Sequence, residues 1–416
     1  MSDDVSSESS EATLVTERAP GLALPQVQLK PRKARPFYGR HPWVLDSAIE
    51  RIDPAAADGD AVDLLCDKGK WIARGLLNRA SRIQVRLYTW SPAEPLDAAF
   101  WRQRLETAVQ LRRDLGYDRP QGAARLVFSE ADGLSGLVVD RYGEHVVVLV
   151  TALAMSKRVD EFVPSLVELL HPKSVLVRHD RQMLKSEGMA AEDRTVHGAT
   201  PEGPVFIEEN GLRFGVDLRG GQKTGFYLDQ RENRRRAAEF CRGRRTLDLF
   251  CYTGGFSLAA IQAGARETLG VDTSERSVEL AKANAALNGF ANARFEAGDC
   301  FERLDALRGA REKFGAVILD PPKFASSGDN VEKALRAYHR LNRVAVDLLE
   351  PGGFLITCSC TGRVSREEFL DMLAGVAQQS KRQIQVLEQR GPAPDHPVSV
   401  SSLEGDYLKC VICRVV

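Results

Sequence analysis

The chain of 416 residues has no excess of either charge, because 57 lysines and arginines balance 57 aspartates and glutamates. This balance argues against binding of nucleic acid through a long basic tail, so any anionic partner must be held by local basic patches. The sequence also has no apolar run near the ~18 residues that a membrane span needs. Residues 1–16 are acidic and serine-rich, which is the wrong charge for a signal peptide. We therefore predict a soluble, cytoplasmic protein that does not bind a membrane.

Cysteine is scarce as well, and its eight residues are too few for a disulfide scaffold. Cys410 and Cys413 form a C-x-x-C motif, but no second pair and no histidine stands near them at zinc-ligand spacing. Both lie in an apolar stretch, residues 407–416, that is typical of a closing strand. We interpret this pair as structural and predict no metal site.

Changes in pattern along the chain predict a multidomain α/β protein. Residues 1–25 carry five acids and one arginine, which predicts a disordered leader. Residues 26–95 contain short alternating apolar runs separated by turns, which indicates a compact β module, either a barrel or a sandwich. Residues 96–204 mix helical and strand patterns, which favours a central α+β domain. Residues 205–416 begin with an Asn-Gly hairpin and continue with alternating strands and helices, the pattern of a doubly wound sheet.

Two basic runs are candidates for RNA contact. Residues 30–40 contain five lysines and arginines and no acid, and they lead into aromatic residues. Bases neutralise phosphate and aromatic rings stack on nucleobases, but a solvated loop before a core tryptophan is an equal alternative. Residues 231–245 hold seven arginines and two glutamates, and here the alternative is the solvated face of a helix. From the first run we select as RNA-binding candidates Lys30, Lys33, Arg35 and Arg40.

A glycine loop between a strand and a helix indicates the cofactor. The predicted strand 246–251 runs into Gly254 and Gly255, and the next strand ends at Asp272, about 18 residues beyond Gly254. In a doubly wound sheet a ligand lies over such a loop, and the acid accepts hydrogen bonds from a ribose. The G-x-G-x-x-G of dinucleotide sites is missing, which favours S-adenosylmethionine, a cofactor without pyrophosphate. Asp299 follows the third strand, where its carboxylate would accept from an adenine amino group. The cofactor candidates of this region are Asp248, Tyr252, Thr253, Gly254, Gly255, Asp272 and Asp299.

The fourth and fifth predicted strands end in residues suited to methyl transfer. Asp320 opens an Asp-Pro-Pro motif like that of amino-methylating enzymes, but Lys323 stands where those enzymes have an aromatic residue. Methylation of a pyrimidine carbon 5 needs a nucleophile that adds to carbon 6, usually a thiolate. Cys360 lies just past its strand and is favoured over Cys358, although both are alternatively small core residues. Asp320 is a candidate for holding both substrate and cofactor, Lys323 is a candidate RNA contact, and no general base is assigned.

Further motifs support a resemblance to a known family. They include Arg40-His41-Pro42-Trp43, Glu130-Ala131-Asp132-Gly133-Leu134, Asp140-Arg141-Tyr142-Gly143, Asp395-His396-Pro397 and Glu404-Gly405-Asp406-Tyr407-Leu408-Lys409. The most distinctive is Gln222-Lys223-Thr224-Gly225-Phe226-Tyr227-Leu228-Asp229-Gln230-Arg231. With these motifs, residues 26–416 resemble the large-subunit ribosomal RNA cytosine-carbon-5 methyltransferase I family. The resemblance implies an N-terminal PUA-like β-barrel, a central α+β domain and a C-terminal Rossmann-like class I methyltransferase domain.

The resemblance also implies an activity, the formation of 5-methylcytidine in large-subunit (23S-type) ribosomal RNA through a covalent cysteine adduct. The family's Ser-Cys-Ser corresponds to Ser-Cys-Thr at residues 359–361, which supports Cys360. Two alternatives stay open, namely methylation of another base atom without an adduct and a non-catalytic RNA-binding or ribosome-assembly factor. The sequence leaves open the target nucleotide, the assembly state of the substrate and whether the chain forms a homodimer. Cofactor contacts are further implied for Phe226, Asp229, Gln230 and Arg231.

Overall fold

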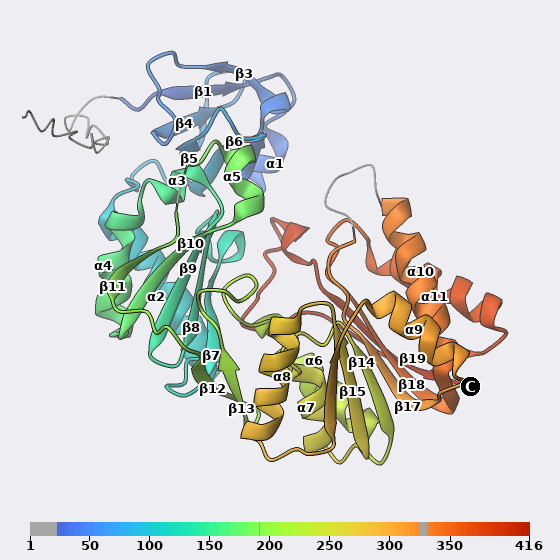
Figure 1. The fold of residues 1–416 in the computed structure, drawn as a ribbon. Helices are drawn as coiled ribbons and strands as arrows, with labels where there is room; N and C mark the ends of the chain where they lie inside the picture. Colours follow the sequence, from blue (N-terminus) through green and yellow to red (C-terminus); the bar gives the residue numbers. More distant parts are fainter. Residues whose placement is uncertain (1–22, 191, 325–330) are drawn as a thin grey trace, which may run out of the picture.

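The computed structural model describes residues 23–190, 192–324 and 331–416. The predicted acidic leader therefore lies, except for residues 23–25, outside the described residues. Figure 1 shows three parts that follow one another along the chain, an N-terminal β domain, a central sheet with helices and a C-terminal α/β lobe. This arrangement confirms the multidomain α/β fold predicted from the sequence. No helix in the described part of the chain is long and apolar enough to cross a membrane.

The N-terminal part is a six-stranded sheet in the order β2-β6-β5-β4-β1-β3. Most neighbouring strands are antiparallel, but β1 and β4 run parallel. In β4 every second side chain is buried, as the alternating apolar pattern predicts. A short helix, α1 (Arg35–Tyr38), follows β1. The strands are β1 (Gln26–Leu29), β2 (Trp43–Leu45), β3 (Ile49–Ile52), β4 (Ala61–Leu65), β5 (Trp71–Leu77) and β6 (Ile83–Thr89).

The central part is a five-stranded sheet in the order β11-β10-β9-β8-β7, with only β9 and β10 parallel. Helix α2 (Ala98–Asp114) begins where the Asp97 carboxylate accepts a hydrogen bond from the Phe100 amide. Its buried face packs against the sheet together with α4 (Val159–Leu170). The strands are β7 (Ala123–Phe128), β8 (Leu137–Tyr142), β9 (His145–Val150), β10 (Ser174–His179) and β11 (Arg194–Gly198), and the short helices are α3 (Leu153–Ser156) and α5 (Arg181–Glu187).

The C-terminal lobe starts with a hairpin of β12 (Val205–Glu209) and β13 (Leu212–Val216) and contains a seven-stranded sheet in the order β16-β15-β14-β17-β18-β20-β19. The strands from β16 to β18 are parallel, and β20 is antiparallel to both of its neighbours. The strand order reverses between β14 and β17, which is where doubly wound sheets bind their ligands. The strands are β14 (Arg245–Leu249), β15 (Glu267–Asp272), β16 (Ala293–Ala297), β17 (Phe314–Leu319), β18 (Leu349–Ser359), β19 (Ile384–Arg390) and β20 (Lys409–Val415).

Helices cover both faces of this sheet (Figure 1). One face carries α6, α7 and α8, and the other carries α9, α10 and α11. All six residues of β17 are buried, as expected for a central parallel strand. Cys410 and Cys413 are buried in β20, in agreement with their predicted structural role. The helices are α6 (Arg231–Cys241), α7 (Gly255–Gln262), α8 (Glu275–Leu287), α9 (Cys300–Gly309), α10 (Val331–Leu348) and α11 (Arg366–Ser380).

A buried carboxylate on β8 joins the central sheet to the C-terminal lobe. Asp140 accepts two hydrogen bonds from the Arg125 guanidinium, at 2.6 and 2.8 Å, and a third at 2.5 Å from the Thr224 hydroxyl. Asp140 and Thr224 have no exposed surface. The Tyr142 hydroxyl adds a contact of 2.9 Å to that of Thr224. The central sheet therefore fixes the start of the segment 222–231, which the family resemblance connects with the cofactor.

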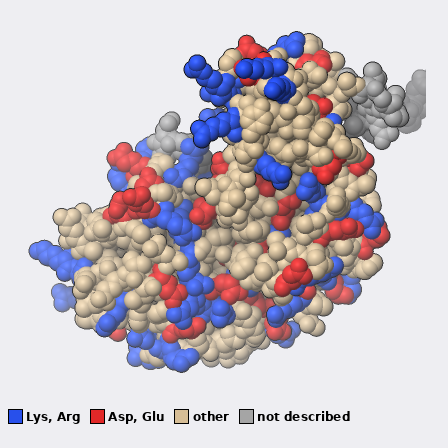
Figure 2. Space-filling view, turned by 180° about the vertical axis from the view of Figure 1, so that it is seen from behind, with Lys and Arg blue, Asp and Glu red and all other residues tan. Residues whose placement is uncertain are grey.

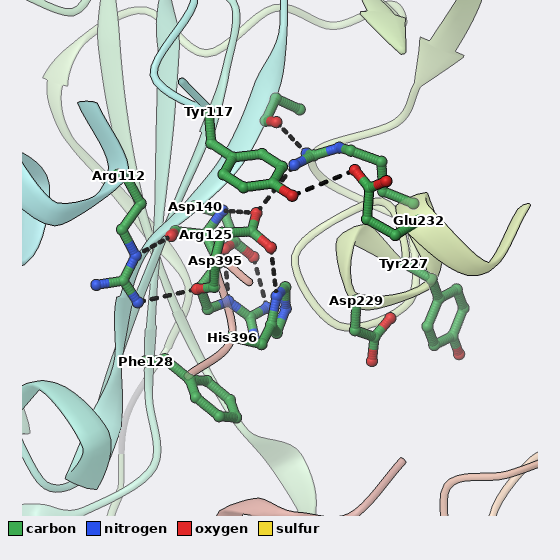
Figure 3. A network of polar contacts seen from close by, with 12 residues as sticks. Arg112, Tyr117, Arg125, Phe128, Asp140, Tyr227, Asp229, Glu232, Asp395 and His396 are labelled. Atoms are coloured by element: carbon green, nitrogen blue, oxygen red, sulfur yellow. Dashed lines mark hydrogen bonds and ion pairs between the residues drawn. The ribbon is translucent and has the colours of Figure 1, made fainter. Parts of the chain in front are cut away.

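A second buried carboxylate, Asp395, lies in the loop between β19 and β20 and contacts the same sheet (Figure 3). It accepts hydrogen bonds from the Arg125 amide at 3.1 Å, from the Arg231 guanidinium at 3.2 Å and from His396 at 2.8 Å. Burial alone would raise the pKa of Asp395, but His396 and Arg231 outweigh it and hold the pKa at about 2. The loop is thereby clamped between the central sheet and α6.

Replacement of Asp140 by alanine tests this junction. Asp140→Ala leaves the Arg125 guanidinium buried without its partner, so we expect the free energy of unfolding to fall by about 3–5 kcal/mol. The matched control is Glu168→Ala, which breaks the pair of Glu168 with Arg102, whose side chains are 60% and 47% exposed. This control should leave the free energy of unfolding close to that of the wild type, because solvent screens an exposed pair. Equal losses in the two variants, measured by calorimetric unfolding, would contradict a structural role for the junction.

Candidate active site

The glycine loop after β14 has a strained course that neighbouring groups hold in place. Tyr252 has a φ of 49° and Gly254 a φ of 85°, both in the left-handed region. A Cβ on Gly254 would stand 2.9 Å from the Phe295 ring, so only glycine fits there. The Asp272 carboxylate at the end of β15 accepts hydrogen bonds from the amides of Tyr252 at 2.9 Å and Ser274 at 3.0 Å. The structure thus brings together Tyr252, Gly254 and Asp272, as the sequence predicts.

Asp248 lies below this loop in the buried part of β14. One carboxylate oxygen accepts from the amide and the hydroxyl of Ser257, at 3.0 and 2.7 Å, in the first turn of α7. The other oxygen, Oδ1, is buried without a hydrogen-bond partner among the described residues. Burial raises the pKa of Asp248 to about 7. Thr253 Oγ1 is also buried and unpartnered in the described part of the chain.

The segment 222–231 places a third carboxylate, Asp229, beside the loop. The Tyr407 hydroxyl donates to Asp229 Oδ2, and the Lys223 ammonium lies 3.5 Å from the same oxygen. Burial alone would raise the pKa of Asp229, but Lys223 and His396 outweigh it and hold the pKa well below its usual range. Asp229 Oδ1 has no partner among the described residues although it is buried.

Asp320, at the end of β17, has a different environment from Asp229. Its Oδ1 accepts a hydrogen bond of 2.9 Å from the side-chain amide, Nε2, of Gln230. Burial and the nearby charge of Asp229 together raise the pKa of Asp320 to about 7. The site therefore combines a carboxylate that stays ionised with one that holds its proton up to neutral pH, which is the arrangement used for acid–base work.

Cys360 faces the same edge of the sheet. It follows the last residue of β18, is only partly buried, and its Sγ lies 3.8 Å from the Pro321 carbonyl, to which it donates. Burial raises the pKa of the Cys360 thiol to about 11, and Asp320 adds to the rise, whereas Lys223 opposes it. Cys358 is fully buried in β18 opposite Cys410, as expected from its position. Of the two cysteines, only Cys360 has exposed surface at the site.

A buried lysine that the sequence reasoning did not assign holds the Cys360 loop. Lys409, in β20, donates two hydrogen bonds of 2.7 Å, to the carbonyls of Thr361 and Val364. It is 2% exposed, and burial lowers its pKa to about 8. The loop is held on its other side by Tyr338, whose hydroxyl contacts those of Ser359 at 3.0 Å and Thr361 at 2.9 Å. The available signal was a lysine at the start of a strand in which only Arg414 is otherwise charged.

Three other cofactor candidates make contacts of a different kind. The Arg231 guanidinium is occupied by Asp395 and by the Ala123 carbonyl. Phe226 is buried against Phe214, with ring centroids 5.2 Å apart. Asp299 is exposed and accepts from the amides of Phe301 and Glu302, at 2.8 and 3.0 Å, as the N-cap of α9. Their contacts with the cofactor stay predictions.

The two basic runs differ in how they are used. In residues 231–245, five of the seven arginines form ion pairs within the protein, namely Arg231, Arg234, Arg235, Arg236 and Arg245. This favours a structural role for that run. In the described part of the chain the side chains of Arg32, Lys33, Arg35, Arg40 and Lys323 have no ion pair, and they are exposed. Figure 2 shows blue atoms gathered on the edge of the N-terminal domain that faces the C-terminal lobe.

The buried donors and acceptors of the site fit S-adenosylmethionine. The unpartnered oxygens of Asp229, Asp248 and Thr253 lie on residues at the carboxyl edge of the sheet and beside it. A cofactor with an ammonium group and ribose hydroxyls supplies the donors that such buried oxygens require. Each Asp272 oxygen accepts one of the backbone hydrogen bonds from Tyr252 and Ser274 and has a further lone pair for a ribose hydroxyl.

Comparison with known proteins agrees with a site for S-adenosylmethionine. A family model described as S-adenosylmethionine-dependent methyltransferase matches residues 194–403, and a PUA-like domain model matches residues 27–90. The chain is 40% identical to ribosomal RNA large subunit methyltransferase I of Tolumonas auensis, over 94% of the chain and 99% of that protein. It is 39% identical to the protein of the same name from Aeromonas hydrophila, over 90% of the chain and 95% of that protein.

Among solved structures, a proposed SAM-dependent methyltransferase from Streptococcus mutans matches with a TM-score of 0.81 at 20% identity, over 94% of this chain and 99% of that one. A proposed methyltransferase complexed with SAH matches equally well, at 21% identity. Fold, site and family models together define a class I S-adenosylmethionine-dependent methyltransferase with an N-terminal PUA-like domain. The chain belongs to the ribosomal RNA large subunit methyltransferase I family.

The raised pKa of Asp248 predicts a pH dependence of stability without cofactor. A folded-state pKa of about 7, against an ordinary value near 4, means that the folded protein binds a proton more tightly than the unfolded chain. The contribution of Asp248 to the free energy of unfolding should therefore fall as pH rises from about 4 to about 7. Asp248→Asn should remove this part of the fall, measured as the unfolding midpoint between pH 4.5 and 8. The exposed variant Glu279→Gln is the control, and a profile of Asp248→Asn that superimposes on wild type would contradict the assignment.

Lys409→Met tests the positioning of the Cys360 loop. The variant leaves the carbonyls of Thr361 and Val364 without their buried donor, so we expect the loop to shift and the methyl-transfer kcat to fall about tenfold or more. The affinity for S-adenosylmethionine, measured by calorimetry, should stay within about twofold. The alkylation rate of Cys360 by iodoacetamide should change in Lys409→Met and not in Lys381→Met, an exposed control. Unchanged alkylation and kcat in a folded Lys409→Met would rule out the positioning role.

Proposed function

We propose that the protein transfers the methyl group of S-adenosylmethionine to carbon 5 of a cytidine in large-subunit (23S-type) ribosomal RNA, through a covalent adduct on Cys360. The observation that carries the proposal is the position of Cys360, a partly exposed thiol beside Asp320 and Pro321 at the edge of the sheet that bears the cofactor residues. The names of the relatives support ribosomal RNA as the substrate. Such a substrate agrees with the cytoplasmic location expected from the sequence.

The proposed reaction proceeds through addition and elimination on the pyrimidine ring. The Cys360 thiolate forms a bond to carbon 6. The electron pair of the 5,6 double bond then moves to carbon 5, which becomes nucleophilic. Carbon 5 then takes the methyl group, which the bound cofactor supplies as an electrophile, leaving S-adenosylhomocysteine. A base removes the proton from carbon 5, the bond between Sγ and carbon 6 breaks, and the 5,6 double bond is restored.

The electrostatics of the site indicate what the thiol needs. With a pKa of about 11, Cys360 is almost wholly protonated at neutral pH until its surroundings change. The charge of Asp320 is one cause of this high pKa. A cytosine that accepts a hydrogen bond from Asp320 keeps that carboxyl group protonated and therefore uncharged. Loss of the Asp320 charge favours the Cys360 thiolate, and the hydrogen bond stabilises the electron density that enters the ring. Binding of the substrate would thus favour the thiolate form of Cys360, which then attacks that substrate.

Lys223 is placed to assist this step. Its ammonium lies 4.6 Å from the centre of the Tyr227 ring and 5.6 Å from that of Tyr407, and 3.5 Å from Asp229 Oδ2. These contacts keep a positive charge beside Cys360, where it lowers the pKa of the thiol. Lys223 also has a positive φ of 52°, which shows that the loop holds the residue in an uncommon conformation. We assign to Lys223 the electrostatic stabilisation of the thiolate.

We assign RNA contact to the basic run at residues 30–40, and not to residues 231–245, where most arginines form ion pairs within the protein. Lys33, Arg35 and Arg40 are exposed and unpaired within the described residues, so they are available for phosphate. Lys30 donates to the Ser47 carbonyl at 3.2 Å and keeps further donors for solvent or RNA. Lys323, beside the catalytic Asp320, is exposed and would contact the RNA near the target base.

Methylation of unmodified ribosomal RNA with labelled cofactor tests the function. Wild type is expected to yield 5-methylcytidine at a defined position. Cys360→Ala should lower the rate by about three orders of magnitude or more, as removal of a covalent nucleophile does. Cys358→Ala is the matched control, since its thiol is fully buried, and it should give the same product at a similar rate.

The same experiment separates the alternatives. A full rate with Cys360→Ala would eliminate the covalent adduct. A methyl group mapped to a nitrogen would favour methylation of another base atom. Cofactor binding with no product on any ribosomal RNA would leave a non-catalytic RNA-binding factor.

A further inference from the structure

A cavity of about 240 Å³ lies where three parts of the chain meet, away from the residues assigned to methyl transfer. The N-terminal domain contributes Arg40 and Trp90, and the central domain contributes Glu130 and Ser135. The loop between β19 and β20, which belongs to the C-terminal lobe, contributes the remaining polar residues, Ser399 and Ser401. Of these lining residues only Arg40 has a role proposed above, as an RNA contact.

The walls of the cavity are prearranged by hydrogen bonds behind them. The Trp90 ring is oriented by its Nε1, which donates to the Phe37 carbonyl at 2.7 Å. Glu130 Oε1 accepts from Trp43 Nε1 at 2.9 Å and from the Ser135 hydroxyl at 2.7 Å, so the carboxylate cannot turn away. The Arg40 guanidinium has no ion pair within residues 23–190, 192–324 and 331–416.

We propose that this cavity binds one unstacked nucleotide of the RNA substrate, distinct from the cytidine that is methylated. The proposal rests on the proposed function, because it takes RNA as the substrate. The Trp90 ring offers a face for stacking, and Arg40 offers a cation for the phosphate. The second Glu130 oxygen and the hydroxyl of Ser401 offer an acceptor and a donor for the edge of the base.

The size of the cavity agrees with this occupant. At roughly 30 Å³ of liquid volume per water, 240 Å³ holds about eight waters. Cytosine and uracil each have eight heavy atoms, and bonded atoms occupy less volume than the same number of waters, so the cavity has room for one base. Arg40, which lines the cavity, is the last residue of the basic run at residues 30–40, which forms no ion pair within the described residues; this run favours a polyanionic chain over a free small molecule.

The loop between β19 and β20 connects the cavity to the active site. Glu404 in this loop lies 3.2 Å from His41 of the N-terminal domain. Further along the loop, Tyr407 donates to the Asp229 carboxylate beside the cofactor residues. A nucleotide seated against Ser399 and Ser401 therefore lies at a fixed place relative to Cys360. The cavity would set the register in which the RNA presents its target base.

Filling the cavity tests the proposal. Ser401→Leu places an aliphatic side chain inside it, and Val400→Leu is the matched control, because Val400 is 92% exposed and does not line the cavity. The measurement is the Kd for an unmodified ribosomal RNA fragment at fixed salt, by filter binding. Loss of one stacked base should weaken binding by Ser401→Leu between about fivefold and a hundredfold, and the control should stay within about twofold. Chemical probing should show one nucleotide protected by wild type and exposed with Ser401→Leu.

A second variant covers the case in which Ser401→Leu does not fold. Arg40→Gln changes an exposed side chain, and it should weaken binding and lower the slope of log Kd against log salt by about one. Wild-type affinity in both folded variants, or in Arg40→Gln alone if Ser401→Leu is unfolded, would overturn the proposal. The affinity measurement needs no methyl transfer. Its outcome is therefore independent of the product analysis that decides the proposed function.

Discussion

The contact on which the methyltransferase site depends is made outside its own sheet, by the Asp140 carboxylate of the central domain. Asp140 binds the Arg125 guanidinium on one side and the Thr224 hydroxyl on the other, and all three residues are buried. Thr224 begins the segment that carries Asp229 and Gln230 to the glycine loop. A buried ion pair contributes little net stability by itself, but it allows only one arrangement of its partners. The central domain therefore helps to position the segment that carries these cofactor candidates.

The carboxyl groups at the edge of the sheet differ in pKa because their neighbours differ. Asp229 is surrounded by Lys223, His396 and the Tyr407 hydroxyl, and these donors keep it ionised despite burial. Within the described residues neither Asp248 nor Asp320 forms an ion pair with a cation, and burial raises the pKa of each to about 7. An ionised group suits a cationic cofactor, and a protonated one suits a base that must gain electron density. The same residue type is thus suited to binding at one position and to chemistry at another.

The balance of charge over the chain hides an unequal distribution. Most arginines of residues 231–245 form ion pairs, among them pairs with carboxylates of the hairpin, of α6 and of β19. The lysines and arginines of residues 30–40 have no such partners in the described part of the chain. Both runs look alike in the sequence. Only their surroundings separate a structural arginine from one that is free to meet phosphate.

The sequence by itself determined the features that depend on neighbours along the chain. The glycine loop, Asp272 at the next strand end and Cys360 just beyond β18 follow from strand and helix periodicity, because the carboxyl ends of parallel strands share one edge. Tertiary structure alone decided that Arg231 binds Asp395, that Lys409 holds the Cys360 loop and that Ser399 and Ser401 meet Trp90 across a cavity. These pairs are separated by many residues, and no local pattern encodes a contact between side chains that only the packed domains bring together.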